Sequence, residues 1–152
     1  MAVAPLPTSG VFDDGEHVLP VRVYYEDTDF TGVVYHASYL RFFERGRTES
    51  LRAIGIDHRA LLERPDPAAF TVTRIAVEFR RAARVDDVLE VRTRYSRFRG
   101  ARLEAAQRLT RGGELLAEAE VEVVCITPDG RARRPPAELV SALASHLASR
   151  AP

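Results

Sequence analysis

The feature that most restricts the fold of this 152-residue chain is a continuous series of strand patterns in its second half. Between residues 70 and 125, apolar residues alternate with polar ones at a period of two. The last segment is the clearest, with small and branched residues on one face and glutamates on the other. The pairs Arg99-Gly100 and Gly112-Gly113 are typical of hairpin turns. Because no helical pattern separates these strands, we expect them to pair in an antiparallel sheet.

One long helical pattern precedes these strands. From His36 to Ile54, apolar residues recur near every 3.6 positions. Gly46 lies inside this segment, where a glycine costs about 1 kcal/mol relative to alanine. We therefore expect another backbone to pass close to Gly46. The apolar face of such a helix must be buried against another layer, and a strongly curved sheet provides that layer.

The remaining segments complete the expected order of elements. A strand pattern runs over residues 19–25, and a closing helix is predicted from residue 137 to about residue 147. Residues 1–17 have no periodicity and are predicted to form a flexible tail. The sequence thus predicts a single α+β domain over residues 18–150, in which a five-stranded antiparallel sheet curves around the long helix.

Composition excludes several classes of protein. The 22 basic residues balance the 22 acidic ones, so the chain has no strong overall field to attract nucleic acid. Cys125 is the only cysteine, which excludes a disulfide framework and a cysteine metal cage, and His17, His58 and His146 have no neighbouring ligands in sequence, so no metal site is expected. Without a signal-peptide pattern or a membrane-spanning apolar run, we expect a cytoplasmic protein without integral membrane association.

The segment that carries reactive groups is the turn between the first strand and the long helix. Asp27 and Asp29 lie in this turn, Gly32 follows, and the helix begins near His36. A helix start presents unpaired N–H groups and partial positive charge, which can hold a carbonyl or an oxyanion. A carboxylate beside it forms a compact hydrolase site, with the carboxylate as nucleophile or general base. An aspartate before a helix is, however, more often a cap than a catalyst.

The same segment resembles the signature of the 4-hydroxybenzoyl-CoA thioesterase family, in particular its YbgC-like branch of acyl-CoA thioesterases. The matching residues are YYEDTD at 24–29, GVVYH at 32–36, Tyr39-Leu40 and ERGRTE at 44–49. A looser resemblance covers roughly residues 19–147. It implies a hotdog fold and hydrolysis of the thioester of acyl-CoA. It also implies a homo-oligomer, a dimer or a tetramer, with active sites at the subunit interface.

The roles of individual residues also follow from this resemblance. It implies that Asp29 is the catalytic carboxylate and that the backbone amide of His36 polarises the thioester carbonyl. It implies no metal and no cofactor, because the CoA belongs to the substrate. The implied substrate-binding residues are Gly32, Val33, Tyr35 and Arg99. Arg99 is assigned to the CoA phosphates, which guanidinium groups bind well.

The chain departs from the family pattern at Phe30-Thr31, where a smaller pair is usual, and at Ser38 and Gly46. Glu44 has two interpretations. It either helps to position a water in a neighbouring subunit or pairs on the helix surface with an arginine at position 41 or 47.

Two alternative functions remain open at this point. One is an enzyme of the same fold that acts on acyl groups carried by an acyl carrier protein. The Asp-centred signature disfavours the dehydratase form of that enzyme but not the thioesterase form. The other is a weakly active binding factor associated with the Tol–Pal envelope system.

Overall fold

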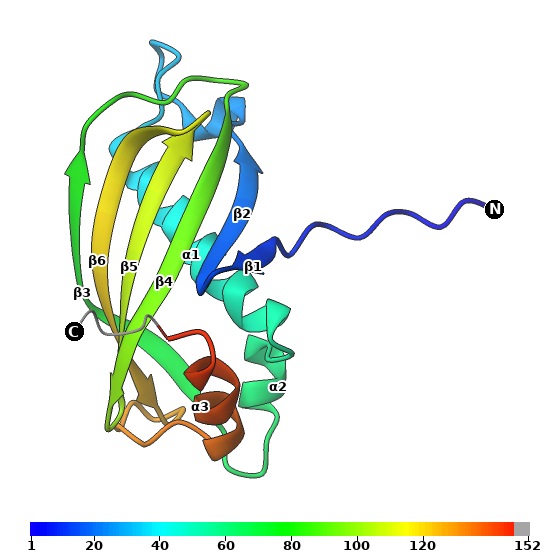
Figure 1. Ribbon diagram of the computed structural model, residues 1–152, viewed down its shortest axis with the longest axis vertical. Helices are drawn as coiled ribbons and strands as arrows, with labels where there is room; N and C mark the ends of the chain where they lie inside the picture. The colour runs from blue at the N-terminus through cyan, green and yellow to red at the C-terminus, as the bar shows by residue number, and fades with distance from the viewer. Residues whose placement is uncertain (148–152) are drawn as a thin grey trace.

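The computed structural model describes residues 1–147 and shows one antiparallel sheet with a long helix along its inner face (Figure 1). The strands are β1 (Val11–Asp13), β2 (Glu16–Arg22), β3 (Ala69–Phe79), β4 (Val88–Arg99), β5 (Arg102–Arg111) and β6 (Glu114–Ile126). The helices are α1 (His36–Ala53), α2 (His58–Leu62) and α3 (Ala137–Ala144), and a 3-10 turn, η1, covers Tyr25–Asp27.

The strands are hydrogen-bonded in the order β1-β2-β4-β5-β6-β3, and all the pairings are antiparallel. The inner face of the sheet packs on α1, where Phe42 and Phe43 are fully buried against residues such as Val91 and Leu109. Burial of each large side chain of this kind stabilises the fold by about 1.5–3 kcal/mol. The predicted α+β architecture, a curved antiparallel sheet around one long helix, is confirmed. This arrangement is the hotdog fold.

The sheet has six strands rather than the predicted five, because the predicted flexible tail is wrong for residues 11–17. These residues form a β1–β2 hairpin across Asp14 and Gly15, which both have positive φ. The ring of Phe12 packs between His17, at a centroid distance of 5.1 Å, and His146, at 4.0 Å. His17 belongs to the hairpin itself, so the stacking of Phe12 on His146 is the contact that holds the hairpin against the body of the domain. The predicted end of the domain, residue 150, lies outside the described residues.

Gly46 lies where α1 approaches the sheet most closely. A Cβ atom at this position would lie 2.5 Å from Cγ1 of Val91 and 3.0 Å from Oγ1 of Thr93. The expectation of a close approach is correct, but the neighbours are side chains of β4 and not another backbone.

Local details of the strand predictions vary in accuracy. β2 ends at Arg22, so Tyr25 lies in η1 and does not continue the strand as predicted. In the sequence, the alternation slips between Val72 and Ile75, which is typical of a bulge, and β3 has a register shift between Val72 and Arg74. The alternation of the last strand places Cys125 on its inner face, and Cys125 is fully buried in β6.

Candidate active site

Asp27 is a structural carboxylate that turns the chain away from β2. Its side chain is only 3% exposed, and Oδ2 accepts a hydrogen bond from the backbone N–H of Tyr24 at 2.8 Å. Its carbonyl oxygen accepts from the N–H of Tyr35 at 3.0 Å. These bonds connect the end of the strand to the residue before α1. The interpretation of Asp27 as a turn or cap carboxylate is confirmed.

Asp29 lies in the next turn, which the backbone closes tightly. Its N–H donates to the carbonyl of Val33 at 2.9 Å, and its own carbonyl accepts from Gly32 at 3.2 Å. Gly32 has a φ of +83°, a left-handed conformation that favours glycine. The turn is held against the loop before β4, where the carbonyl of Ala83 accepts from the N–H of Val34 at 2.8 Å.

The two oxygens of the Asp29 carboxylate have different environments. Oδ1 accepts from both the hydroxyl of Thr31, at 2.6 Å, and its backbone N–H, at 2.7 Å. No hydrogen-bond donor among residues 1–147 contacts Oδ2. The hydroxyl and then the N–H of Thr31 lower the pKa of Asp29 from its ordinary value. The group is therefore an ionised carboxylate with one oxygen available for chemistry.

α1 begins at His36 without a side-chain cap. Tyr35 is the residue before the helix, with an extended backbone, and its side chain makes no capping hydrogen bond. The first N–H groups of an α-helix have no partners within the helix. The imidazole of His36 is exposed beside the ring of Tyr35, at a centroid distance of 4.4 Å. The backbone N–H of Ser38 donates to the carbonyl of Tyr35 at 2.8 Å, and within residues 1–147 the N–H groups of His36 and Ala37 have no acceptor.

The structure brings together five of the six predicted site residues. Asp29, Gly32, Val33, Tyr35 and His36 lie within one short segment between η1 and α1. Arg99 lies at the opposite end of the 12-residue strand β4, which at about 3.3 Å per residue places it roughly 35 Å from the beginning of the strand.

Arg84 is a residue that the sequence interpretation did not assign to the site. It forms an isolated β-bridge with Val33, and it is exposed. No ion pair or side-chain hydrogen bond joins its guanidinium to another residue within the described part of the chain. The only sequence signal was its place in a cluster of arginines near residues 80–84, which has an equally good interpretation as a solvated charged surface.

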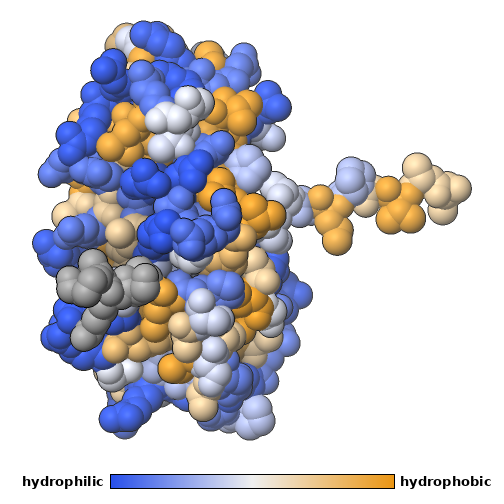
Figure 2. All heavy atoms as spheres, in the orientation of Figure 1, coloured by the Kyte–Doolittle hydropathy of each residue, from blue (hydrophilic) through white to orange (hydrophobic). Residues whose placement is uncertain are grey.

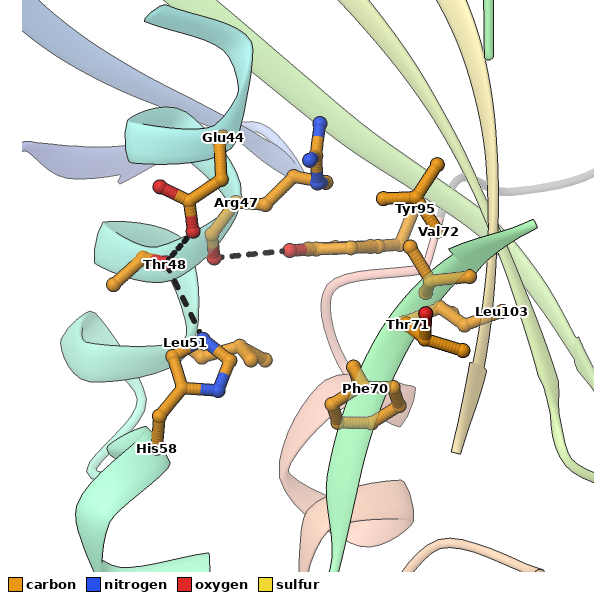
Figure 3. Close-up of a pocket in the computed structure, with 11 residues that line it drawn as sticks. Glu44, Arg47, Thr48, Leu51, His58, Phe70, Thr71, Val72, Tyr95 and Leu103 are labelled. Atoms are coloured by element: carbon orange, nitrogen blue, oxygen red, sulfur yellow. Dashed lines mark hydrogen bonds between the residues drawn. The ribbon is translucent and has the colours of Figure 1, made fainter. Parts of the chain in front are cut away.

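A cavity of about 120 Å³ lies further along α1, between this helix and β3 (Figure 3). One wall is polar, because the Thr48 hydroxyl donates to Oε1 of Glu44 at 2.6 Å and lies 3.3 Å from Nε2 of His58. The opposite wall is apolar and includes Phe70 and Val72 of β3. The predicted pairing of Glu44 with an arginine is wrong, since within residues 1–147 its carboxylate accepts from Thr48 and forms no ion pair.

A groove adjoins this cavity and shares Glu44, Arg47 and Val72 with it. The groove extends along α1 to Leu40, one helical turn after His36, and Ile75 of β3 also lines it.

The outer face of the sheet is different in character. Hydrophilic residues cover much of the face shown in Figure 2. Arginines and glutamates of neighbouring strands pair there, as Arg97 does with Glu104 at 3.0 Å and Arg102 does with Glu122 at 3.5 Å. The candidate chemistry therefore lies at the start of α1 and not on this face. No group of three or more potential metal ligands occurs among residues 1–147. The same residues contain no helix long and apolar enough to cross a membrane.

An antiparallel sheet wrapped around one long helix is also the fold of a solved probable thioesterase that this chain resembles. The family model described as the thioesterase-like superfamily matches residues 23–144. The chain therefore belongs to this superfamily.

The similar curated proteins identify the branch of the superfamily to which the chain belongs. The acyl-CoA thioesterase YbgC of Haemophilus influenzae is 48% identical over 113 residues, which cover 74% of this chain and 82% of that protein. The acyl-CoA thioester hydrolase YbgC of Escherichia coli is 50% identical over 110 residues, covering 72% and 81%. The chain is thus an enzyme of the YbgC type, and the family predicted from the turn and helix signature is confirmed.

Solved structures agree with this assignment. A probable thioesterase from Bartonella henselae superimposes with a TM-score of 0.78 at 42% identity, over 80% of this chain and 99% of that one. A hypothetical protein from Thermus thermophilus gives a TM-score of 0.81 at 32% identity, over 88% and 99%. Both likenesses extend over at least 80% of this chain.

Proposed function

We propose that this chain hydrolyses acyl-CoA thioesters, with Asp29 as the reacting carboxylate and the amide of His36 as the group that polarises the thioester carbonyl. The observation that carries the proposal is the free Oδ2 of Asp29 in the turn that leads into the uncapped start of α1. The names of the relatives at 48% and 50% identity support acyl-CoA as the substrate.

The reaction has two routes from this geometry. In the first, Oδ2 of Asp29 attacks the carbonyl carbon, the C–S bond breaks, and water then hydrolyses the acyl-aspartyl anhydride. In the second, Oδ2 accepts a proton from a water that attacks the carbonyl directly. Both routes place the oxyanion at the amide of His36 and yield a free acid and the CoA thiol. A thiolate is a good leaving group, so neither route requires a resident cofactor.

The substrate would enter where the turn is exposed. Tyr35 is 51% exposed and borders the start of α1, so it contacts the acyl or pantetheine part in this proposal. Gly32 and Val33 form the backbone wall beside Asp29. The groove that begins at Leu40 would receive the acyl chain.

A cation on the path of the pantetheine arm would bind the CoA phosphates. Arg84 lies next to Val33, and we propose that it is the arginine that binds the CoA phosphates. Arg99 would contribute only from a second copy, because it lies at the far end of β4.

We also propose that the active enzyme is a homo-oligomer formed through β3. This 11-residue strand is at the edge of the sheet, with β6 as its only neighbour in the sheet order. Val72 and Phe79 on this strand are 44% and 51% exposed. A long apolar edge is a template for pairing with another strand. A second copy would cover β3 and close the groove beside it. We place this activity in the cytoplasm, where a CoA thioester substrate is available.

The test is thiol release from a panel of acyl-CoAs of increasing chain length, with wild type and Asp29→Asn. Loss of a positioned carboxylate should lower kcat/KM at least ~10²-fold. Glu26→Gln is the matched control, because Glu26 is an exposed carboxylate of the same loop. Equal turnover by Asp29→Asn and wild type would refute the role of Asp29. Solvent label in the Asp29 carboxylate after a single turnover in H₂¹⁸O would establish the anhydride route, because water that attacks the aspartyl carbonyl of the anhydride leaves its oxygen there.

Activity on an acyl carrier protein substrate is measured in the same experiment. If the enzyme hydrolyses the acyl group on the carrier protein but not the matching acyl-CoA, the substrate class is acyl carrier protein thioesters. The proposed role of Asp29 would still stand.

A further inference from the structure

We infer that Thr31 is a positioning residue for the reaction, which holds one oxygen of Asp29 so that the other faces the substrate. The inference rests on the proposed role of Asp29 and adds a residue to it. Thr31 occupies one of the two positions where the chain departs from the smaller pair usual in its family.

The inference rests on two hydrogen bonds that Thr31 donates to one oxygen of Asp29. The hydroxyl and the backbone N–H of Thr31 both donate to Oδ1 of Asp29, at 2.6 Å and 2.7 Å. Two donors that share one acceptor fix the torsion of the carboxylate. Because Asp29 is partly exposed, packing alone would leave its side chain free to change rotamer. With Oδ1 held, Oδ2 is the oxygen left to attack carbon or to accept a proton.

The same two bonds set the protonation state of the carboxylate. Donors to an ionised oxygen stabilise the charged form, and both proposed routes require that form. The pKa of Asp29 is lowered first by the hydroxyl of Thr31 and then by its N–H. The hydroxyl therefore keeps Asp29 competent at acid pH, and its removal should reduce the fraction that is ionised there.

A neighbouring threonine provides a control within the same turn. The hydroxyl of Thr28 donates to the carbonyl of Tyr25 at 2.7 Å and does not contact Asp29. Thr28→Val and Thr31→Val each remove one hydroxyl and keep a β-branched side chain. They differ in whether the lost hydroxyl was bonded to the carboxylate.

The experiment measures kcat and KM against pH for wild type, Thr31→Val, Thr31→Ser and Thr28→Val on one acyl-CoA. Thr31→Val should lower kcat about tenfold, the usual effect of losing one hydrogen bond to a charged group, with KM nearly unchanged. The acid limb of its kcat/KM profile should move to higher pH. Thr31→Ser keeps the hydroxyl and should restore both properties, and Thr28→Val should resemble wild type.

Two further measurements keep this inference separate from the proposed function. Titration of the Asp29 carboxyl carbon by ¹³C NMR should show a higher midpoint in Thr31→Val, whether or not Asp29 is catalytic. In an Asp29→Asn background, Thr31→Val should cause no further loss of activity, because Thr31 acts through Asp29. An unchanged NMR midpoint and pH profile in Thr31→Val would overturn the inference. An active Asp29→Asn enzyme would instead overturn the function on which it rests.

Discussion

Two carboxylates of this chain share a lowered pKa and differ in almost everything else. Glu16, at the start of β2, is only 8% exposed, and the guanidinium groups of Arg92, Arg94 and Arg108 lie within 3.3 Å of its oxygens. Asp29 lies in the turn before α1, and among residues 1–147 Thr31 alone donates hydrogen bonds to its carboxylate. Burial by itself would raise the pKa of Glu16, and hydrogen bonds from Arg92 and Arg108 lower it below its usual range.

The difference shows that a shifted pKa does not identify a catalyst. Both oxygens of Glu16 are occupied by arginines, so the group is a structural anion that holds β2 against β4 and β5. Asp29 has a free oxygen and precedes a helix start without a cap. Unused hydrogen-bonding capacity next to the uncapped start of α1 separates the two carboxylates more clearly than their titration does.

The largest expected effect comes from replacing Asp29 by its amide. Asp29→Asn should lower kcat/KM at least ~10²-fold while the thermal midpoint stays close to wild type, because the group is partly exposed and contacts only its own turn. Calorimetry beside the thiol-release assay checks both results. If Asp29→Asn instead lost much of its stability and kept its activity per folded molecule, Asp29 would be a structural carboxylate like Glu16.

Glu16→Gln should have the opposite profile. Removing the charge leaves three guanidinium groups without their shared anion, and we expect the free energy of unfolding to fall by about 2 kcal/mol, about a 30-fold change in the folding equilibrium. Urea unfolding measures this change, and kcat/KM of the folded enzyme should be unchanged. A loss of activity without a loss of stability would place Glu16 in the chemistry instead.

The pH dependence of stability sharpens the same comparison. The folded-state pKa of Glu16 lies below 4.5, the ordinary value for a glutamate side chain. Its stabilising contribution is therefore complete above about pH 4.5 and is lost as the pH falls through the folded-state pKa. The difference in unfolding free energy between wild type and Glu16→Gln should shrink as urea unfolding is carried from pH 7 towards pH 3. A difference that stays constant over that range would contradict the ion-pair account.

The sequence was informative where periodicity or a long motif was present. The period of two in the second half of the chain predicted the antiparallel sheet, and the 3.6 spacing predicted α1 nearly to its ends. The spacing of Asp29, Gly32 and His36 predicted one connected site, because a turn of fixed length can join a strand to a helix in only a few ways.

Short or long-range features could not be predicted in this way. β1 has three residues, too few for any period, and only the Asp14-Gly15 pair signalled its hairpin. The bond from Thr31 to Asp29 depends on the conformation of the turn, which residue types alone do not define. Thr48 is four residues from Glu44, and the expected arginine partners at 41 and 47 are three residues from it; both spacings place side chains on one helix face, so spacing alone could not choose the partner.

The smallest predicted effect concerns which arginine binds the CoA phosphates. It follows from the contrast between the surroundings of Glu16 and those of Asp29. Around Glu16 the arginines are neutralised by a carboxylate, whereas Arg84 beside the Asp29 turn has no ion-pair partner within residues 1–147. An unpaired guanidinium is available to a phosphate, so Arg84→Ala should raise KM for acyl-CoA by roughly three- to tenfold. KM for the matching N-acetylcysteamine thioester, which lacks phosphates, should not change. Arg99→Ala is the comparison variant. If Arg99→Ala alone raises KM for acyl-CoA, and the effect disappears when the oligomer is dissociated, the phosphates are bound across two copies and Arg84 is a solvated surface residue.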